Sequence, residues 1–197
     1  MHPAFPAPLL LLGLLPLIGC GDHPAASPAS PASPAAVAAS TGCLAGGAGY
    51  LRATLRGVIN ADLYWRDAEM SCEGSLRPDG SGLRVTLAGP LPGDGAPRRL
   101  RFLFGIDAKG PNGPDRALPT NVTVIVEGAQ QLYSTQGDDK CTTDSLRRET
   151  PDAAQPALKH IEARGFCTGP AATLDGSARV LVSRFDFAAV LHTEDHP

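Results

Sequence analysis

Five cysteines are the residues of this sequence with the most chemistry open to them: Cys20, Cys43, Cys72, Cys141 and Cys167. None of them is spaced as Cys-x-x-Cys, so the pattern supports neither a redox dithiol nor a zinc ribbon. Disulfides use thiols in pairs, and an odd cysteine in a disulfide-forming protein needs a separate explanation. One cysteine therefore has to be set apart from the other four.

The densest group of polar side chains lies in residues 137–144 and contains Asp138, Asp139 and Asp144. Three carboxylates in one short span could supply the hard oxygen ligands that calcium prefers. The spacing is not that of an EF-hand, and Gly-Asp-Asp is also common in hairpin turns. We therefore expect a turn with no required metal or other cofactor, and the three aspartates stay as candidate ligands. The Gly- and Pro-rich loop 107–115 is a second candidate site, expected to be solvated.

Motifs for catalysis are missing from the sequence, which has no GxSxG, HExxH, Walker or GxGxxG pattern. A hydrolytic triad can still be assembled from distant residues, because geometry and not order defines one. His160 is the one histidine well inside the expected domain, and we predict a surface histidine there and no catalytic residue. Trp65, beside Tyr64, could form a ligand platform. It continues the alternating apolar positions Ala61 and Leu63, however, so we expect it in the core.

The N-terminal segment has the features of an export signal. Residues 9–19 (LLLLGLLPLIG) are apolar throughout, and no Lys, Arg, Asp or Glu occurs before Asp22. A membrane-spanning helix needs about 20 apolar residues, and Pro16 would interrupt one. An apolar run of about 7–15 residues that ends in small ones is the size of a signal-peptide core. We expect residues 1–19 to be a signal peptide.

The end of this segment, Leu17-Ile18-Gly19-Cys20, resembles the lipobox of bacterial lipoproteins. In that family the cysteine thiol is acylated and the chain is cut just before it. The resemblance therefore implies a lipid on Cys20, a membrane anchor, and a place in the cell envelope, at the outer membrane facing the periplasm or the cell surface. It also leaves four cysteines, an even set that suits an oxidising compartment.

A low-complexity linker follows the anchor, in residues 20–41, where Ala-Ser-Pro occurs three times in tandem. Such a segment has little to bury and is expected to be disordered. At roughly 3.1 Å per residue, it can hold a domain up to about 60 Å from a membrane. Residues 42–197 remain as the folded domain. The formal net charge of −3 gives no basic patch for nucleic acid.

From Cys43 onward, short runs with alternating apolar residues are separated by turns, which is typical of strands. We expect strands near residues 51–55, 59–65, 83–87, 100–104, 122–126, 131–136, 158–167 and 177–192. With no helical period, the fold class is all-β: an antiparallel β-sandwich or barrel of about eight strands with two disulfides. The alternation changes phase between Val182 and Phe185, which predicts a bulge near Ser183.

Strand register selects one of the three possible disulfide pairings. A three-residue turn around Gly57 would pair Ala53 with Ala61, and a bulge near residues 66–67 would then bring Cys43 opposite Cys72. A hairpin through residues 150–156 would bring Cys141 opposite Cys167. We therefore expect the disulfides Cys43–Cys72 and Cys141–Cys167. A turn centred on residues 93–94 would likewise pair Leu87 with Leu100.

The domain also resembles uncharacterised bacterial lipoproteins, in the stretches Cys72-Glu73-Gly74 and Phe185-Asp186-Phe187. That resemblance implies no particular activity. The expected function is binding in the cell envelope, with a protein partner. Two alternatives remain open: an inhibitor of a secreted enzyme, like the small β-barrel lipoproteins that block lysozyme, and a hydrolase. A protruding loop with an acidic or aromatic tip would favour the inhibitor, and a cleft joining His160 to a serine and an aspartate would favour the hydrolase.

Overall fold

The computed structural model describes residues 43–93, 95–108, 117–129 and 131–193. Residues 1–19, predicted to be a signal peptide, Cys20 and the predicted linker lie outside the described residues, as does most of the loop 107–115. The described residues form eleven β-strands and one turn of 3-10 helix, without an α-helix. In this part of the chain, no helix is long and apolar enough to cross a membrane. The all-β prediction is confirmed, with more strands than the expected eight.

The elements follow one another along the chain as strands of two to fourteen residues. They are β1 (Tyr50–Gly57), β2 (Ala61–Arg66), η1 (Asp67–Glu69), β3 (Ser71–Leu76), β4 (Gly82–Leu91), β5 (Arg98–Asp107), β6 (Leu118–Val126), β7 (Gln131–Ser134), β8 (Cys141–Glu149), β9 (Leu158–Cys167), β10 (Ala171–Ala172) and β11 (Arg179–His192).

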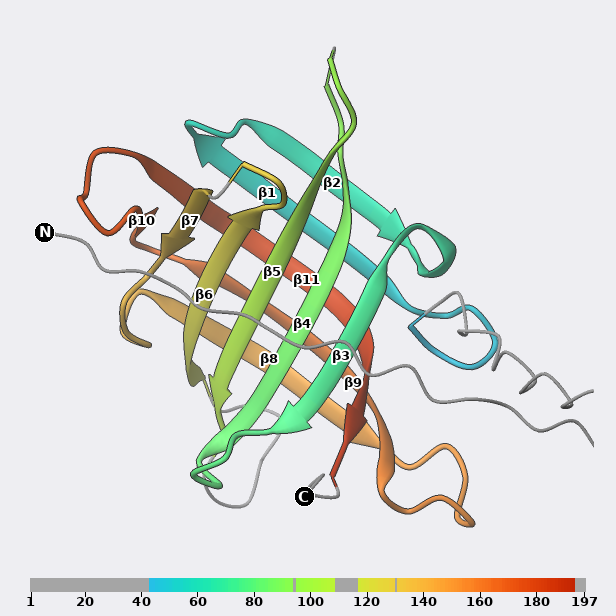
Figure 1. Cartoon of the computed structure of the whole chain (residues 1–197). Helices are drawn as coiled ribbons and strands as arrows, with labels where there is room; N and C mark the ends of the chain where they lie inside the picture. Colours follow the sequence, from blue (N-terminus) through green and yellow to red (C-terminus); the bar gives the residue numbers. More distant parts are fainter. Residues whose placement is uncertain (1–42, 94, 109–116, 130, 194–197) are drawn as a thin grey trace, which may run out of the picture. The chain divides into compact units, whose positions relative to one another are not determined.

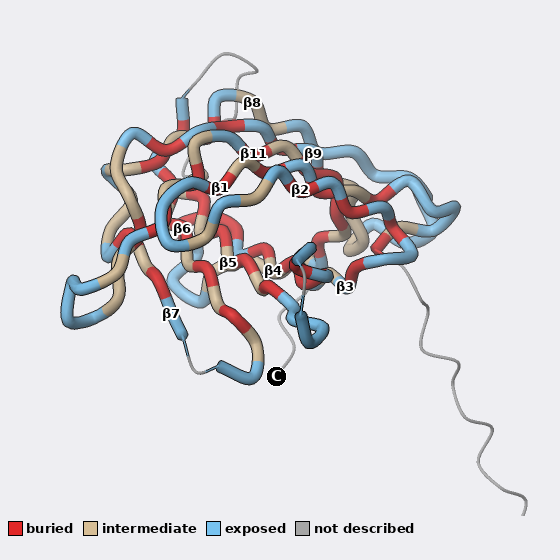
Figure 2. Tube along the Cα trace, turned by 90° about the horizontal axis from the view of Figure 1, so that it is seen from above, coloured by how far each residue is buried: buried red, intermediate tan, exposed pale blue. Residues whose placement is uncertain are grey.

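Hydrogen bonds join all of these strands into one sheet that is folded over into two layers. The first layer has the order β2-β1-β11-β9-β8, and the second has the order β3-β4-β5-β6-β7. The layers connect where β8 pairs with β6, where the two-residue β10 pairs with both β7 and β11, and where β11 meets β3 in the one parallel contact among the described strands. Figure 1 shows the strands of the two layers crossing, and Figure 2 shows the buried residues between the layers. The architecture is therefore sandwich-like.

The core forms because alternate residues of each strand point between the layers. Phe102 and Phe104 of β5 and Phe185 and Phe187 of β11 are all fully buried. The Phe104 ring centroid lies 4.9 Å from the centroids of both Phe185 and Phe187, so the aromatic contact joins the two layers. Buried aromatic side chains of this size dominate the energetics of a core.

Trp65 occupies one end of the same core, as its alternation predicted. Its side chain is 2% exposed, and its ring packs edge-on against Phe102 with centroids 5.7 Å apart. The indole Nε1–H donates a hydrogen bond to the Pro90 carbonyl oxygen at 2.8 Å. The facing residue, Gly89, has the indole ring where a Cβ would stand, so glycine is required inside that strand.

Two of the three predicted hairpin registers were wrong by two residues. Ala53 pairs with Leu63 and not with Ala61, because the β1–β2 turn is two residues longer than expected. Gly57 enters this turn with φ +120, a region that favours glycine, and the Asn60 side chain donates to the Gly57 carbonyl at 2.8 Å. In the β4–β5 hairpin, Leu87 likewise pairs with Phe102 and not with Leu100. A shift of two keeps the same residues inward, so the core was still predicted correctly.

The predicted bulge in the last strand is confirmed. Thr54 of β1 lies opposite Arg184, whereas Leu55 lies opposite Val182, so Ser183 is the extra residue. Its hydroxyl donates to the Thr54 carbonyl oxygen at 3.3 Å. The bulge returns Val182 and Phe185 to the same buried side of β11.

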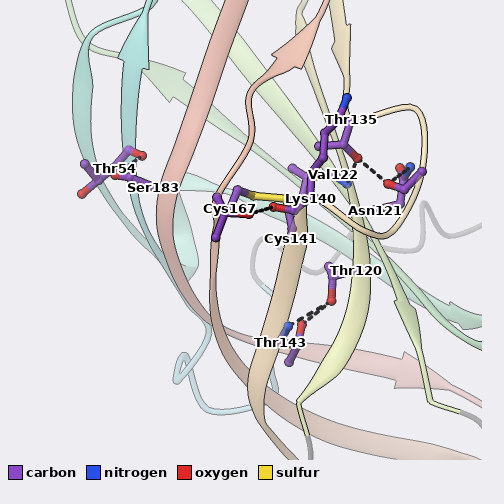
Figure 3. Close-up of a disulfide and its surroundings, with 12 residues drawn as sticks. Thr54, Thr120, Asn121, Val122, Thr135, Lys140, Cys141, Thr143, Cys167 and Ser183 are labelled. Carbon is purple, nitrogen blue, oxygen red and sulfur yellow. Dashed lines mark hydrogen bonds between the residues drawn. A yellow bond between two sulfur atoms is a disulfide. The ribbon is translucent and has the colours of Figure 1, made fainter.

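The disulfide pairing is confirmed for both bridges. Cys141 lies directly opposite Cys167 in the β8–β9 hairpin, as expected (Figure 3). The geometric route to the other bridge was wrong, because Cys43 lies in the loop before β1, and Cys72 lies in the second layer, opposite Leu87 of β4. The Cys43–Cys72 bridge therefore links the loop that precedes β1 to β3 of the second layer.

The corner between β6 and β8 is held by a buried pair of hydroxyls (Figure 3). The Thr120 hydroxyl donates to the Leu118 carbonyl at 2.9 Å, so it accepts from the Thr143 hydroxyl at 2.8 Å. It also accepts from the Thr143 backbone N–H at 3.1 Å. These bonds satisfy polar groups at the point where the chain passes from one layer to the other.

Candidate functional site

The candidate metal ligands lie in and beside the β7–β8 turn. Within the residues that the structure describes, no group of three His, Cys, Asp or Glu is placed to hold a metal ion, so Asp138, Asp139 and Asp144 are not brought together as ligands. The Asp138 carbonyl oxygen accepts the Thr120 N–H at 3.1 Å, which is a turn contact. Asp144 is the bulged residue of β8, and its Oδ1 lies 3.4 Å from Nε of Arg164.

His160 lies in β9, half-buried, opposite Glu149 of β8 and Val190 of β11. Four surface hollows are defined by described residues, and His160 lines none of them. The cleft that would have favoured a hydrolase is therefore not among these hollows.

The β4–β5 hairpin extends beyond its neighbouring strands (Figure 1). The described residues of its tip are Pro92, Gly93 and residues 95–97, which are Gly, Ala and Pro. Asp94 lies outside the described residues.

The outward face of the first layer gathers aromatic and charged side chains from strands that are distant in sequence. Strand register places Tyr64 of β2, Arg52 of β1, Asp186 of β11 and Arg164 of β9 side by side in one row. The adjacent row carries Arg66, Tyr50, Ala188, Glu162 and Arg147 in the same strand order, ending on β8. We call these two rows the Tyr–Arg face.

Arg52 is held in place at the centre of this face. Its guanidinium carbon lies 5.2 Å from the ring centroid of Tyr50 and 5.2 Å from that of Tyr64. Its Nη1 lies 3.8 Å from Oδ2 of Asp186. Each cation–π contact at an exposed site is worth about 0.5–1 kcal/mol. Several weak contacts on one side chain hold the guanidinium in one place, which lowers the entropy cost of using it in binding.

Tyr50 is fixed by a hydrogen bond from its hydroxyl to Oδ1 of Asp186 at 2.8 Å. Burial raises the pKa of Tyr50 to about 12, and the hydrogen bond to Asp186 and the negative charges of Asp186 and Glu162 act in the same direction. The positive charge of Arg52 acts in the opposite direction. Tyr50 therefore stays protonated at physiological pH and donates its proton to the carboxylate.

A polar hollow of about 230 Å³ opens on this face between β1, β11, β9 and β8. Among its lining residues Ser145 and Ala163 have short side chains, while the other side chains are long. The residues lining it are Tyr50, Ser145, Arg147, Glu162, Ala163, Arg164 and Asp186. We call it the β8–β9 hollow.

Two large aromatic side chains of the same layer are exposed to solvent. Tyr64 is 53% exposed and Phe166, on β9, is 41% exposed. Tyrosine and arginine are enriched among the residues that carry most of the binding energy at protein interfaces. The Tyr–Arg face thus combines the contacts of Arg52, the exposed ring of Tyr64 and a polar hollow.

The outward face of the second layer has a hollow of about 350 Å³, whose lining includes Glu73, Arg84, Leu103 and Ile125. Leu132, on the neighbouring β7, is 40% exposed. Among the described residues this face has no exposed tyrosine such as Tyr64, and it offers positions at which matched control substitutions can be made.

Sequence reasoning did not find the Tyr–Arg face. The available pattern was Tyr50 and Arg52 in one strand and Tyr64 and Arg66 in the next, at alternating positions of one hairpin. The predicted register puts Tyr50 opposite Tyr64 and Arg52 opposite Asp62, whereas in the structure Arg52 lies opposite Tyr64. The contribution of β9 and β11 depends on long-range pairing, which no local pattern shows.

No family model matches this chain, and neither a curated protein nor a solved structure matches it. The assignment of a function therefore depends on the geometry of the chain itself.

Proposed function

We propose that this protein is an exported lipoprotein of the bacterial envelope, anchored by a lipid on Cys20, whose β domain acts by binding a partner protein through the Tyr–Arg face. The anchor is supported by the Leu17-Ile18-Gly19-Cys20 motif and by the number of cysteines. With Cys43, Cys72, Cys141 and Cys167 joined in two disulfides, Cys20 is left over as the odd cysteine.

The observation that carries the binding proposal is the position of Arg52 between two tyrosine rings on an outward sheet surface. A folded domain gains little stability from exposing Tyr64, since burying an aromatic side chain is what makes it stabilising. An exposed ring beside a fixed guanidinium is the arrangement that a partner can cover with a large gain in affinity. A linker of about 20 residues would give the face the reach to meet a partner away from the membrane.

The anchor is tested by fractionation of cells that produce the full chain. With Cys20→Ser the protein should move from the membrane fraction to the soluble fraction, because the acyl chains contribute about 0.8 kcal/mol per buried methylene. Labelling with an alkyne fatty acid should mark the wild type and not the variant. Wild-type protein that is exported, unlabelled and soluble would rule out the anchor.

The binding face is tested by chemical cross-linking in intact cells, followed by purification of the tagged full chain. Arg52→Ala and Tyr64→Ala should each reduce recovery of the partner at least about tenfold, which corresponds to the 1.4 kcal/mol or more that central interface residues contribute. Arg84→Gln is the matched control, because it removes an exposed cation from the opposite face. Equal recovery by all three variants would reject the Tyr–Arg face as the site.

A further inference from the structure

Arg147 and Glu162 are directly opposite each other on β8 and β9. Opposite charges at such positions usually attract each other, because the side chains of facing residues are neighbours. Other charged residues of this layer do pair: Arg52 with Asp186, Arg56 with Asp62, and Arg164 with Asp144. Among the described residues, Arg147 and Glu162 form no ion pair, and both line the β8–β9 hollow.

In the hollow, Arg147 and Glu162 lie beside charged side chains that already have partners. The Asp186 carboxylate is already engaged by the Tyr50 hydroxyl and lies near Arg52. Arg164 has its contact with Asp144 at 3.4 Å, on an exposed side chain where such a pair is weak. The wall formed by β8 and β9 therefore presents a cation and an anion side by side, neither of them in an ion pair among the described residues, next to the space beside the short side chain of Ser145.

The charges limit which ligand fits this space. An anion alone would meet Arg147 but also the negative charge of Glu162, and a cation alone would meet Glu162 but also the two guanidinium groups. A ligand that carries an ammonium and a carboxylate together is complementary to both. A space of about 230 Å³ accommodates a group of the size of an amino acid or a short peptide end.

We infer that the β8–β9 hollow binds a zwitterionic, amino-acid-like group, with its carboxylate toward Arg147 and its ammonium toward Glu162. This inference rests on the proposed function, because it names the chemistry that the binding face recognises. The group can be a free amino acid or dipeptide, or the same group at the end of a larger partner, and the experiment below separates these sources.

The test uses the full-length protein purified in non-ionic detergent and ligand-observed saturation-transfer NMR. The probes are L-alanine and L-alanyl-L-alanine, compared with N-acetyl-L-alanine, which lacks the ammonium, and L-alaninamide, which lacks the carboxylate. At least one zwitterion should bind about tenfold more tightly than both single-charge compounds, because each lost partner leaves a charged group of the hollow unmatched.

The variants Arg147→Gln and Glu162→Gln should each weaken the zwitterion about tenfold, while Arg84→Gln on the opposite layer should leave its binding unchanged. Both substitutions are at exposed positions, and a melting curve for each variant shows that the domain is still folded. Equal binding of N-acetyl-alanine or alaninamide overturns the inference, and so does the absence of saturation transfer to any probe.

The result is separable from the proposed function. If partner recovery depends on Arg52 and Tyr64 but the zwitterions do not bind, the inference is wrong and the binding face stands. If the zwitterions bind and partner recovery does not depend on Arg52 or Tyr64, the hollow is a small-molecule site and the proposed protein partner is wrong. Competition by alanyl-alanine against partner recovery would show that the partner supplies the group itself.

Discussion

Removing the carboxylate of Asp67 should destabilise the domain more than any other single change of a side chain near its entry loop. Asp67 is 5% exposed, and its Oδ1 accepts the Leu44 N–H at 2.9 Å and the Gly49 N–H at 2.8 Å. These bonds hold the loop that begins with Cys43. A Cβ on Gly49 would collide with both Oδ1 of Asp67 and Cβ of Cys43, so this position has no room for a side chain.

The magnitude follows from the two hydrogen bonds. Each hydrogen bond to a charged group contributes about 1.5–3 kcal/mol. The Leu44 N–H is only partly buried, so water can replace some of its bond. Asp67→Ala should therefore lower the free energy of unfolding by about 3–5 kcal/mol, which is about 6–20 °C in Tm for a domain of this size. Asp67→Asn keeps one acceptor oxygen and should lose less.

Thermal unfolding followed by circular dichroism, without reductant, measures both variants. Glu69→Ala is the matched control, because the Glu69 carboxylate accepts a single exposed N–H, that of Arg66, at 2.8 Å. It should cost about 1 kcal/mol or less. If Asp67→Ala and Glu69→Ala have the same Tm, the reasoning about the buried carboxylate is refuted.

Three other predictions concern the core, the second disulfide and the binding face. Replacing Cys141 and Cys167 by alanine should cost about 3.5 kcal/mol in urea unfolding, because the bridge closes a 26-residue separation; an unchanged midpoint would contradict this. Gly89→Ala should cost about 1–3 kcal/mol, since the new methyl group meets the Trp65 ring, and a gain in Tm would show that the ring moves freely. Folding favours the protonated form of Tyr50, so its contribution to stability is present below pH 10 and lost as the pH rises through about 12; an ultraviolet titration should show one tyrosine with a pKa near 12, absent in Tyr50→Phe.

The parts of the fold that depend on local alternation could be predicted from sequence. Inward residues such as Phe102 and Phe185 stay on the same side of the sheet for any even shift in register. The core residues were therefore predicted correctly although the lengths of two hairpin turns were not. The bulge at Ser183 was visible because the apolar phase changes within one strand. The Cys141–Cys167 bridge followed from a single hairpin with a well-defined loop.

The parts that depend on long-range pairing could not be predicted in the same way. After Arg66 the chain makes a 3-10 turn and leaves the first layer, so Cys72 faces β4 rather than the start of β1. The β8–β9 hollow depends on Tyr50, Ser145 and Asp186 coming together from strands that are at least forty residues apart in sequence. No local pattern specifies that meeting, because tertiary packing determines it.

Site-specific photo-cross-linking in intact cells tests the central claim most directly. A benzophenone amino acid is placed at position 64, on the Tyr–Arg face, or at position 132, where Leu132 is also exposed but belongs to the second layer. The account predicts one defined adduct from position 64, lost when Arg52→Ala is added, and no such adduct from position 132. The same adduct from both positions, or one from position 132 alone, would contradict binding through the Tyr–Arg face.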